Sequence, residues 1–204
     1  MVRACNLIAT FLNDSCYDER LIEVDFLNAL NQIMKPEAEF ESIRVQQVTY
    51  NKQRLWEVFL QEKGLKRVPL SKMGSGLKTV VLVLLNLLII PNTEEYKDKK
   101  IVYGFEELEN NLHPALQRRL FEYIYKHTIE NNAIVFLTTH SHIAINAYFD
   151  KKNTSIYHVV KENGTAQIKR IESYIDKTEI LDDLDVKASD ILQSKRLCHL
   201  NYPL

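Results

Sequence analysis

The sequence is poor in the features that mark secreted, nucleic-acid-binding and membrane-spanning proteins. Its three cysteines, Cys5, Cys16 and Cys198, are scattered without metal-type spacing, which favours a reducing compartment. The formal net charge of −1 gives no global electrostatic case for nucleic-acid binding, although a local basic patch stays open. The longest apolar run, residues 80–90, is shorter than the roughly 20 residues that cross a membrane. Because the first residues also make a poor signal peptide, we expect a soluble, cytoplasmic protein.

The composition that remains is that of an ordinary globular protein. The chain has 204 residues, of which 46% are hydrophobic and 26% are charged, so it can bury a core. This length suits one moderately large domain, or one domain with a tail.

The pattern of apolar residues predicts an α/β fold. Short apolar runs predict buried strands at residues 101–105 and 133–138, and a helix over 114–130 between them indicates a βαβ unit in a parallel sheet. A helix over 21–34 has one apolar stripe, formed by Ile22, Phe26, Leu30 and Ile33. The other expected elements are a hairpin over 42–60, a nearly all-apolar helix over 77–90, a charged connector over 91–100, a hairpin over 156–171 around Asn163-Gly164, and a loosely helical segment from 173.

Two adjacent carboxylates, Glu106 and Glu107, follow the strand at 101–105. Adjacent side chains at the end of a strand point in different directions, and two acids there repel each other unless a cation or a proton relieves them. Holding Mg²⁺ beside a hydrolytic water is the usual use of such a pair. The alternative is a solvated acidic turn, the commoner explanation of a Glu-Glu pair taken alone.

A loop with two serines and two glycines, residues 70–76, leads into the apolar helix. Gly74 and Gly76 let backbone amides approach an anion, and the helix N-terminus adds a favourable dipole. Ser71 and Ser75 have hydroxyls that can donate to phosphate oxygens. The alternative is a flexible connection that ends in a helix N-cap.

His140 directly follows the strand at 133–138, between Thr139 and Ser141. Ligands of open parallel sheets bind at the carboxyl ends of the strands, so a histidine there can hydrogen-bond a phosphate or a water. The alternative is a solvated loop histidine. His140 and His142, at alternate positions of an expected extended segment, make a poor metal pair, because such spacing is weak evidence and no cysteine or third histidine lies nearby in the sequence.

The order and spacing of these segments resemble the ATPase domain of the ABC class and, within it, the overcoming-lysogenization-defect (OLD) family, whose AAA-type ATPase core precedes a Toprim nuclease domain. The resemblance runs from about residue 5 to residue 193. Residues 70–76 resemble the signature loop, and residues 101–107 resemble Walker B followed by the catalytic glutamate. Residues 111–114 are similar to the D-loop, and residues 136–141 to the switch-histidine segment.

The resemblance implies a role for each candidate residue. Glu106, which stands where most members carry Asp, would orient Mg²⁺ through its water shell. Glu107 would polarise the attacking water, and His140 would sense the γ-phosphate of ATP. The signature loop would act across a dimer, with Ser71 or Ser75 and the amides of Gly74 and Gly76 reaching ATP held mainly by the partner. In this class, positioning and electrostatics do most of the work of phosphoryl transfer.

Two departures from the family pattern matter. The motif Gly-x-x-x-x-Gly-Lys-Ser/Thr occurs nowhere in the sequence, and residues 74–79 imitate it only superficially, because Leu77 separates Gly76 from Lys78. Residues 188–193 resemble the segment that leads into the Toprim domain, but residues 194–204 depart from it and no acidic Toprim motif follows. We therefore expect residues 1–174 to be the carboxyl-terminal portion of an ABC/OLD-like ATPase domain, with residues 175–204 a charged helical tail.

Three functions fit these observations. The first is a partial ATPase module of an OLD-like DNA-processing, DNA-repair or phage-defence endonuclease system, completed by a chain or segment that bears the phosphate loop. The second is a non-catalytic assembly or regulatory subunit that uses the same dimer surface without ATP turnover. The third, a stand-alone phosphate-binding module, would use residues 74–79. Whether the chain itself hydrolyses ATP stays open.

The missing amino-terminal lobe of this fold has a structural consequence. The central sheet should lack neighbouring strands and leave an apolar edge or face exposed, which would promote self-association. We expect a homo- or hetero-oligomer.

Overall fold

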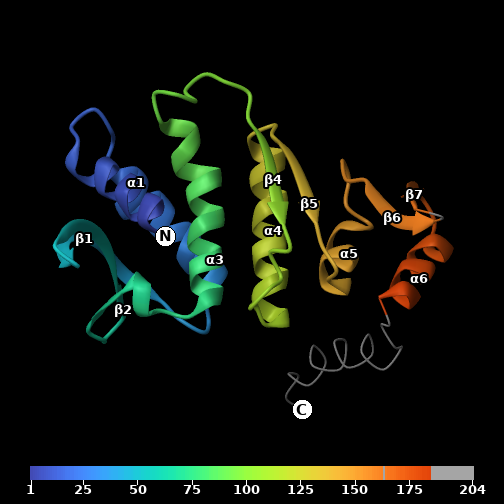
Figure 1. Ribbon diagram of the computed structural model, residues 1–204, viewed down its shortest axis with the longest axis horizontal. Helices are drawn as coiled ribbons and strands as arrows, with labels where there is room; N and C mark the ends of the chain where they lie inside the picture. Colours follow the sequence, from blue (N-terminus) through green and yellow to red (C-terminus); the bar gives the residue numbers. More distant parts are fainter. Residues whose placement is uncertain (163, 185–204) are drawn as a thin grey trace, which may run out of the picture. The chain divides into compact units, whose positions relative to one another are not determined.

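The computed structural model describes residues 1–162 and 164–184 and forms two compact units, Met1–Thr139 and His140–Leu204 (Figure 1). The first unit contains all the expected nucleotide-site residues except His140. The expected boundary after residue 174 stays a prediction, because most of the expected tail, including residues 188–204, lies outside the described residues.

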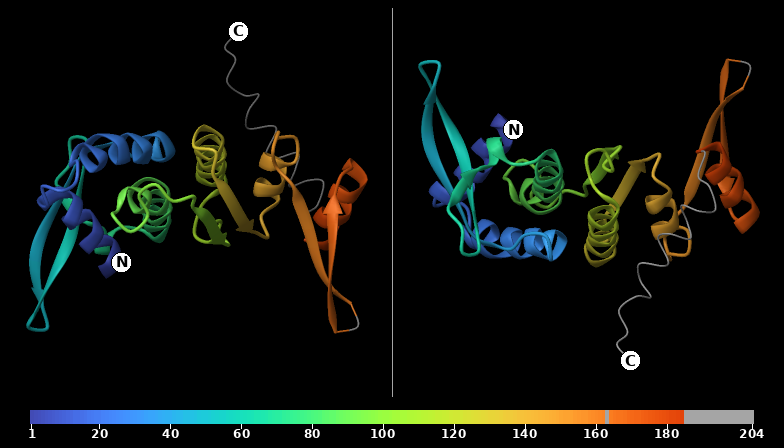
Figure 2. Two further views of the ribbon diagram at one scale, coloured as in Figure 1. Left: turned by 90° about the horizontal axis from the view of Figure 1, so that it is seen from above. Right: turned by 90° about the horizontal axis from the view of Figure 1, so that it is seen from below.

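A long antiparallel hairpin and helix α1 form one part of the first unit. Strands β1 (Phe40–Tyr50) and β2 (Gln53–Glu62) pair along their length, and Figure 2 shows them as an extended ribbon. Asn51 and Lys52 have φ angles of 48° and 64°, the left-handed conformation of tight hairpin turns. The expected hairpin is confirmed.

The structure adds two elements that the sequence pattern does not reveal. Helix α1 (Val2–Asn13) packs on β2, and the short strand β3 (Arg67–Pro69) pairs with β2.

The helix expected over residues 21–34 is confirmed in two parts. A π-helical segment, η1 (Leu21–Phe26), continues directly into α2 (Leu27–Met34). The expected apolar stripe is completely buried, with no exposed surface at Ile22, Phe26, Leu30 or Ile33. Burial of this stripe is what stabilises the helix against the rest of the unit.

The apolar helix begins at Ser75, two residues before the expected start at Leu77, and the turn before it is a short 3₁₀ segment, η2 (Leu70–Lys72). Helix α3 (Ser75–Leu84) continues as a π segment, η3 (Leu85–Ile89), and a 3₁₀ turn, η4 (Ile90–Asn92). In length and composition alone, Ser75–Asn92 is the one described helix that could cross a membrane. Here its apolar side chains pack against η1 and α2, as expected of the core helix of a globular domain.

The expected βαβ unit is confirmed. Strands β4 (Val102–Glu106) and β5 (Ile134–Thr138) pair in parallel, in a register that places Val102 beside Ile134 and Glu106 beside Thr138. Helix α4 (Pro114–Glu130) connects them and lies along one face of the two-stranded sheet (Figures 1 and 2). The parallel pairing therefore places the carboxyl ends of both strands at one edge.

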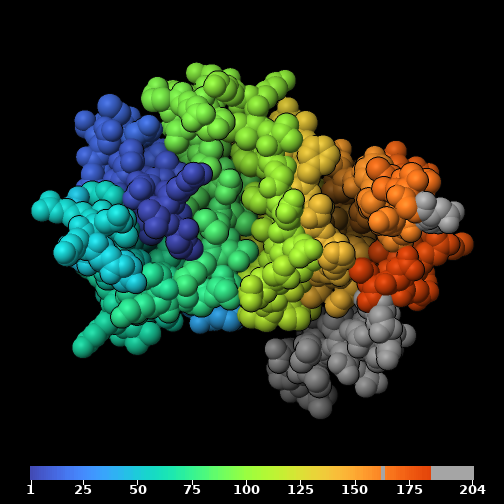
Figure 3. Space-filling view, in the orientation of Figure 1, coloured from blue at the N-terminus to red at the C-terminus, as the bar shows by residue number. Residues whose placement is uncertain are grey.

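The other face of this sheet exposes large apolar side chains. Successive side chains of a strand alternate between the two faces, and Val102, Ile134 and Phe136 share the face opposite Tyr103. These three side chains are 58%, 55% and 67% exposed, whereas Tyr103 is buried. In the space-filling view, β4 and the loop after it lie at the surface (Figure 3). The expectation of an exposed apolar face is confirmed.

The second unit has its own small core. Helix α5 (His142–Tyr148), strands β6 (Ile156–Glu162) and β7 (Thr165–Ile171), and helix α6 (Tyr174–Asp183) surround a cluster of Ile145, Ile171 and Ile180. The expected hairpin over 156–171 is confirmed by the antiparallel pairing of β6 with β7. Asn163 of its turn lies outside the described residues.

Candidate functional site at the carboxyl edge of the parallel sheet

The two expected carboxylates lie where the parallel strands end. Glu106 is the last residue of β4, beside Thr138 of β5, and the backbone N–H of Glu107 donates to the Thr138 carbonyl at 2.9 Å. Both glutamates are exposed. Glu107 has a φ angle of 45°, a left-handed conformation that is uncommon for a residue with a long side chain. Such strain persists only where the surrounding contacts hold it, and it is frequent at functional sites.

The segment that begins at Glu107, residues 107–112, is a turn with its own hydrogen bonds. We call it the carboxylate loop. The side-chain amide of Asn110 donates to Glu107 Oε2 at 2.9 Å, and its backbone N–H donates to the Glu107 carbonyl at 3.1 Å. The backbone N–H of Leu112 donates to the Glu109 carbonyl at 3.0 Å. The carboxylate of Glu107 is thus oriented by its own loop.

Two further residues hold this loop and were not among the expected site residues. The Thr139 hydroxyl, just beyond β5, donates to Glu109 Oε1 at 2.8 Å. The side chain of Gln117, on α4, is buried and donates to the Leu112 carbonyl at 2.8 Å. The sequence signal for each is weak. Thr139 lies in the polar segment Thr138-Thr139-His140-Ser141, and Gln117 is a polar residue beside the apolar positions Leu116 and Leu120, a pattern that does not mark either as part of a site.

The loop expected to bind phosphate lies in the same unit. Gly74 caps α3 in an extended conformation, and Gly74 and Ser75 are both exposed. The backbone N–H of Ser71 donates to a carboxylate oxygen of Glu57 at 3.2 Å. Lys78 bends back on the loop and donates to the Ser71 carbonyl at 2.8 Å. These contacts engage the backbone of Ser71, so the hydroxyls of both Ser71 and Ser75 stay predicted phosphate donors.

His140 is exposed and is the first residue of the second unit. Ser141, which follows it, is buried and caps α5 by accepting a hydrogen bond from the Ile143 N–H at 3.2 Å. His142 is the first residue of α5 rather than part of an extended segment, which corrects the geometry assumed for a His140-x-His142 pair. The structure therefore joins Glu106, Glu107, Ser75 and Gly76 within one unit, whereas His140 belongs to the other.

Comparison with known proteins identifies the family. A model of the AAA ATPase domain matches residues 18–145, more than half of the chain. The chain belongs to the AAA ATPase domain family. The matched part includes both glutamates, the loop before α3 and His140. The comparison with curated proteins gave no match.

Solved structures place this AAA ATPase domain in the fold of SMC ATPase heads. A structure from work on ATP-driven dimerization and DNA-stimulated activation of SMC ATPases is 16% identical, with a TM-score of 0.59 over 90% of this chain and 98% of that one. The Smc head of Pyrococcus yayanosii with its coiled coil and joint is 15% identical (TM-score 0.57, 81% of this chain and 29% of that one). An Smc head bound to the C-winged helix domain of ScpA is 14% identical (TM-score 0.57, 87% and 52%). At these identities the likeness establishes the fold.

Membership of an ATPase family implies a nucleotide and usually Mg²⁺, and the chemistry of the edge suits both. Exposed carboxylate oxygens are the ligands that hard cations take, and Mg²⁺ commonly binds one or two carboxylates while phosphates and water supply the rest. Within residues 1–162 and 164–184, no three His, Cys, Asp or Glu side chains gather into a metal site. As two exposed carboxylates, Glu106 and Glu107 would suit a cation whose other ligands come from the nucleotide and water.

Proposed function

We propose that this AAA ATPase domain supplies two carboxylates, a switch histidine and a signature loop to a composite ATP site. The observation that carries the proposal is the end of the β4–β5 pair, where Glu107 is held by Thr138 and Asn110 with its carboxylate exposed. A fixed, solvent-facing carboxylate beside a second one is the arrangement needed to orient a water next to a phosphate-bound cation.

The role proposed for each residue comes from the family resemblance. Glu106 would orient Mg²⁺ through its water shell, Glu107 would polarise the attacking water, and His140 would sense the γ-phosphate. When bound, Mg²⁺ neutralises the charge that develops on the phosphates. The signature loop would donate the hydroxyl of Ser71 or Ser75 and backbone amides to ATP held mainly by a partner.

The β- and γ-phosphates need a cradle that these 204 residues do not encode, since they contain no Gly-x-x-x-x-Gly-Lys-Ser/Thr motif. The proposal therefore includes another chain or segment that bears this loop. The wider setting we propose is an OLD-like, DNA-processing or phage-defence endonuclease system, on the basis of the Glu-Glu-Leu-Glu-Asn-Asn-Leu-His-Pro and Thr-Thr-His-Ser segments. Among its structural neighbours, SMC ATPases show ATP-driven dimerization.

The proposal is tested by Glu107→Gln in the complex in which a phosphate-loop chain completes the site. Glutamine keeps the size of the side chain but cannot polarise the water as a carboxylate does, so turnover should fall by at least about a hundredfold while nucleotide binding persists. Lys78→Ala is the companion variant, because Lys78 belongs to residues 74–79, and its removal should abolish nucleotide binding only if those residues form a stand-alone phosphate site. Equal turnover in wild type and Glu107→Gln would refute a catalytic role.

A second candidate function is a non-catalytic assembly subunit, and the exposed face of Val102, Ile134 and Phe136 favours it. Such a subunit would use this face to dock without turning over ATP. Glu107→Gln separates the two functions, because only the catalytic module depends on that carboxylate.

A further inference from the structure

The first turn of α3 and the carboxylate loop lie in direct contact at Gly76. A Cβ atom placed on Gly76 would lie 2.9 Å from the Asn111 carbonyl oxygen and 3.1 Å from Leu112 Cδ2. The nearer atom belongs to the backbone, so it cannot rotate away as a flexible side chain could. A Cβ on Gly74, only two residues earlier, would meet nothing within 4 Å. The two glycines of the signature loop therefore have different reasons to lack a side chain.

The carboxylate loop is held on a second side by Gln117. This side chain is only 9% exposed, and its amide nitrogen lies 2.8 Å from the Leu112 carbonyl and 3.4 Å from the Glu109 carbonyl. Both bonds reach the loop backbone rather than a side chain. Gln117 therefore fixes the path of the loop from α4, while Gly76 limits its position from α3.

The path of this loop decides where the Glu107 carboxylate points. Asn110 lies between the two contacts, and its side-chain amide holds Glu107 Oε2 at 2.9 Å. Glu107 and Asn111 both have left-handed φ angles, 45° and 66°, which the loop can keep only if its neighbours hold it. A shift at Asn111 or Leu112 would therefore move Asn110 and disturb the bond that orients the Glu107 carboxylate.

From this geometry we infer that Gly76 and Gln117 are positioning residues for Glu107, acting through the Asn110 side chain. Gly76 acts by allowing close packing and Gln117 by bonding the loop carbonyls. The consequence for catalysis rests on the proposed function, in which Glu107 orients the water. The structural claim itself can be tested without nucleotide.

The experiment compares Gly76→Ala with Gly74→Ala by NMR of the full chain. Two reporters are read: hydrogen exchange at the Glu107 backbone amide and the chemical shifts of the Asn110 side-chain amide. We expect Gly76→Ala to speed exchange at Glu107 at least about tenfold and to shift the Asn110 resonances toward free-amide values. Gly74→Ala should leave both reporters at their wild-type values, because the added methyl group meets open space.

Gln117→Leu provides an independent variant if Gly76→Ala does not fold. It keeps the approximate size of the side chain but removes both bonds to the loop, so it should move the same two reporters while exchange at Tyr103 in β4 stays unchanged. Wild-type reporters in folded Gly76→Ala or Gln117→Leu would overturn the inference, as would an equal response to Gly74→Ala. Turnover of wild type and Glu107→Gln in the complex that supplies the phosphate loop reports separately on the proposed function, so the two failures are distinguishable.

Discussion

The position of Glu107 can be predicted from the sequence, but its conformation depends on tertiary contacts. Its place after β4 follows from the sequence, because an apolar run that ends in two acids predicts carboxylates at the end of a strand. Its left-handed backbone and its bond with Asn110 do not, since they depend on contacts from α3 and α4 that no local pattern reveals. Gln117 is missed for the same reason. A buried glutamine on a helix can be recognised as functional only once the carbonyls that it reaches are known.

The bond from Thr139 to Glu109 should stabilise the edge of the sheet. Thr139→Val keeps the shape of the side chain but removes the hydroxyl that donates to Glu109 Oε1, so we expect the free energy of unfolding to fall by about 1–3 kcal/mol. Trp56, the only tryptophan, lies in the first unit and reports its unfolding in urea by fluorescence.

Thr49→Val on the exposed part of β1 is the control for this prediction and should change stability by less than about 0.5 kcal/mol. A double-mutant cycle with Glu109→Gln then isolates the pair, because removal of the hydroxyl should matter less once the carboxylate is gone. Additive effects of the two substitutions would show that the bond contributes no coupling energy.

At the scale of elements, the sequence predicts those with a clear period and misses those without one. The stripe from Ile22 to Ile33 and the Pro114 start of α4 are strong signals, and both helices are where the sequence places them. The hairpins are equally clear, because their turns contain residues that accept left-handed backbone. Helix α5 is not predicted, because it has only seven residues and follows a polar segment that is typical of a loop. Helix α1 acquires its regular structure by packing on β2, a strand distant in the sequence.

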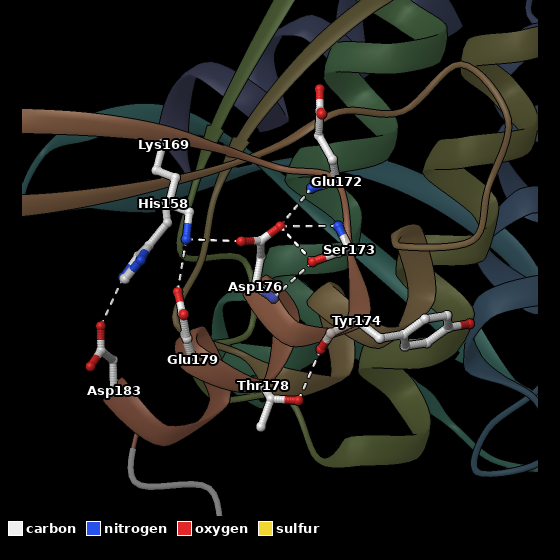
Figure 4. Close-up of polar contacts among 9 residues, drawn as sticks. All are labelled: His158, Lys169, Glu172, Ser173, Tyr174, Asp176, Thr178, Glu179 and Asp183. Carbon is white, nitrogen blue, oxygen red and sulfur yellow. Dashed lines mark hydrogen bonds and ion pairs between the residues drawn. The ribbon is translucent and has the colours of Figure 1, made fainter.

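Helix α6 depends on charges at its start (Figure 4). Ser173 and Asp176 form a capping box, and Lys169 of β7 pairs with Asp176 and Glu179 at 2.8 Å each. The hydrogen bond from Lys169, followed by those from Ser173, holds the pKa of Asp176 well below its usual value. Because this pKa is lower in the folded than in the unfolded chain, the ionised carboxyl group stabilises the folded helix at pH values above the unfolded pKa of about 3.9. This stabilisation is lost as the pH falls toward the folded pKa.

We therefore expect α6 to be ordered at neutral pH and to loosen in acid. Amide protection of residues 176–181, measured by hydrogen exchange, should decrease as the pH falls below about 4, after correction for the intrinsic exchange rate. Asp176→Asn should show part of this loosening already at pH 7, since it removes the carboxylate charge that pairs with Lys169, although Ser173 still accepts from the backbone N–H of residue 176 and Glu179 still pairs with Lys169. Glu172→Gln, an exposed change outside the capping box, is the control, and the same pH profile in Asp176→Asn as in wild type would contradict this account.

For the whole molecule, the sequence gives the architecture and the family-like segments but not the finer identity. The β4–α4–β5 unit and the segment order are enough to indicate an ABC-like ATPase lobe, and the family match and the SMC-head fold agree with that architecture. The assignment to an OLD-like system rests on short motifs, and short motifs do not determine a partner or a substrate. The OLD-like system, its partner and its substrate therefore stay proposals.

The exposed apolar face of the β4–β5 sheet should drive self-association. Sedimentation velocity of the wild type should show concentration-dependent oligomers, because Val102, Ile134 and Phe136 together offer apolar surface that water disfavours. Phe136→Asp should reduce this association, since it places a charge at the centre of the face. Tyr50→Asp, at a position that is 67% exposed at the end of β1, is the matched control and should associate like the wild type. A wild-type chain that stays monomeric at all concentrations would rule this prediction out.

The most direct test of the central claim is ATP binding and hydrolysis by the purified 204-residue chain with Mg²⁺, beside its Glu107→Gln variant. The account predicts neither saturable binding at micromolar ATP nor turnover by either protein, because the residues present provide carboxylates and a signature loop without a phosphate cradle. Turnover by the wild type that disappears in Glu107→Gln would contradict it. The chain would then hold a complete site, and residues 74–79 would be the part to reassign.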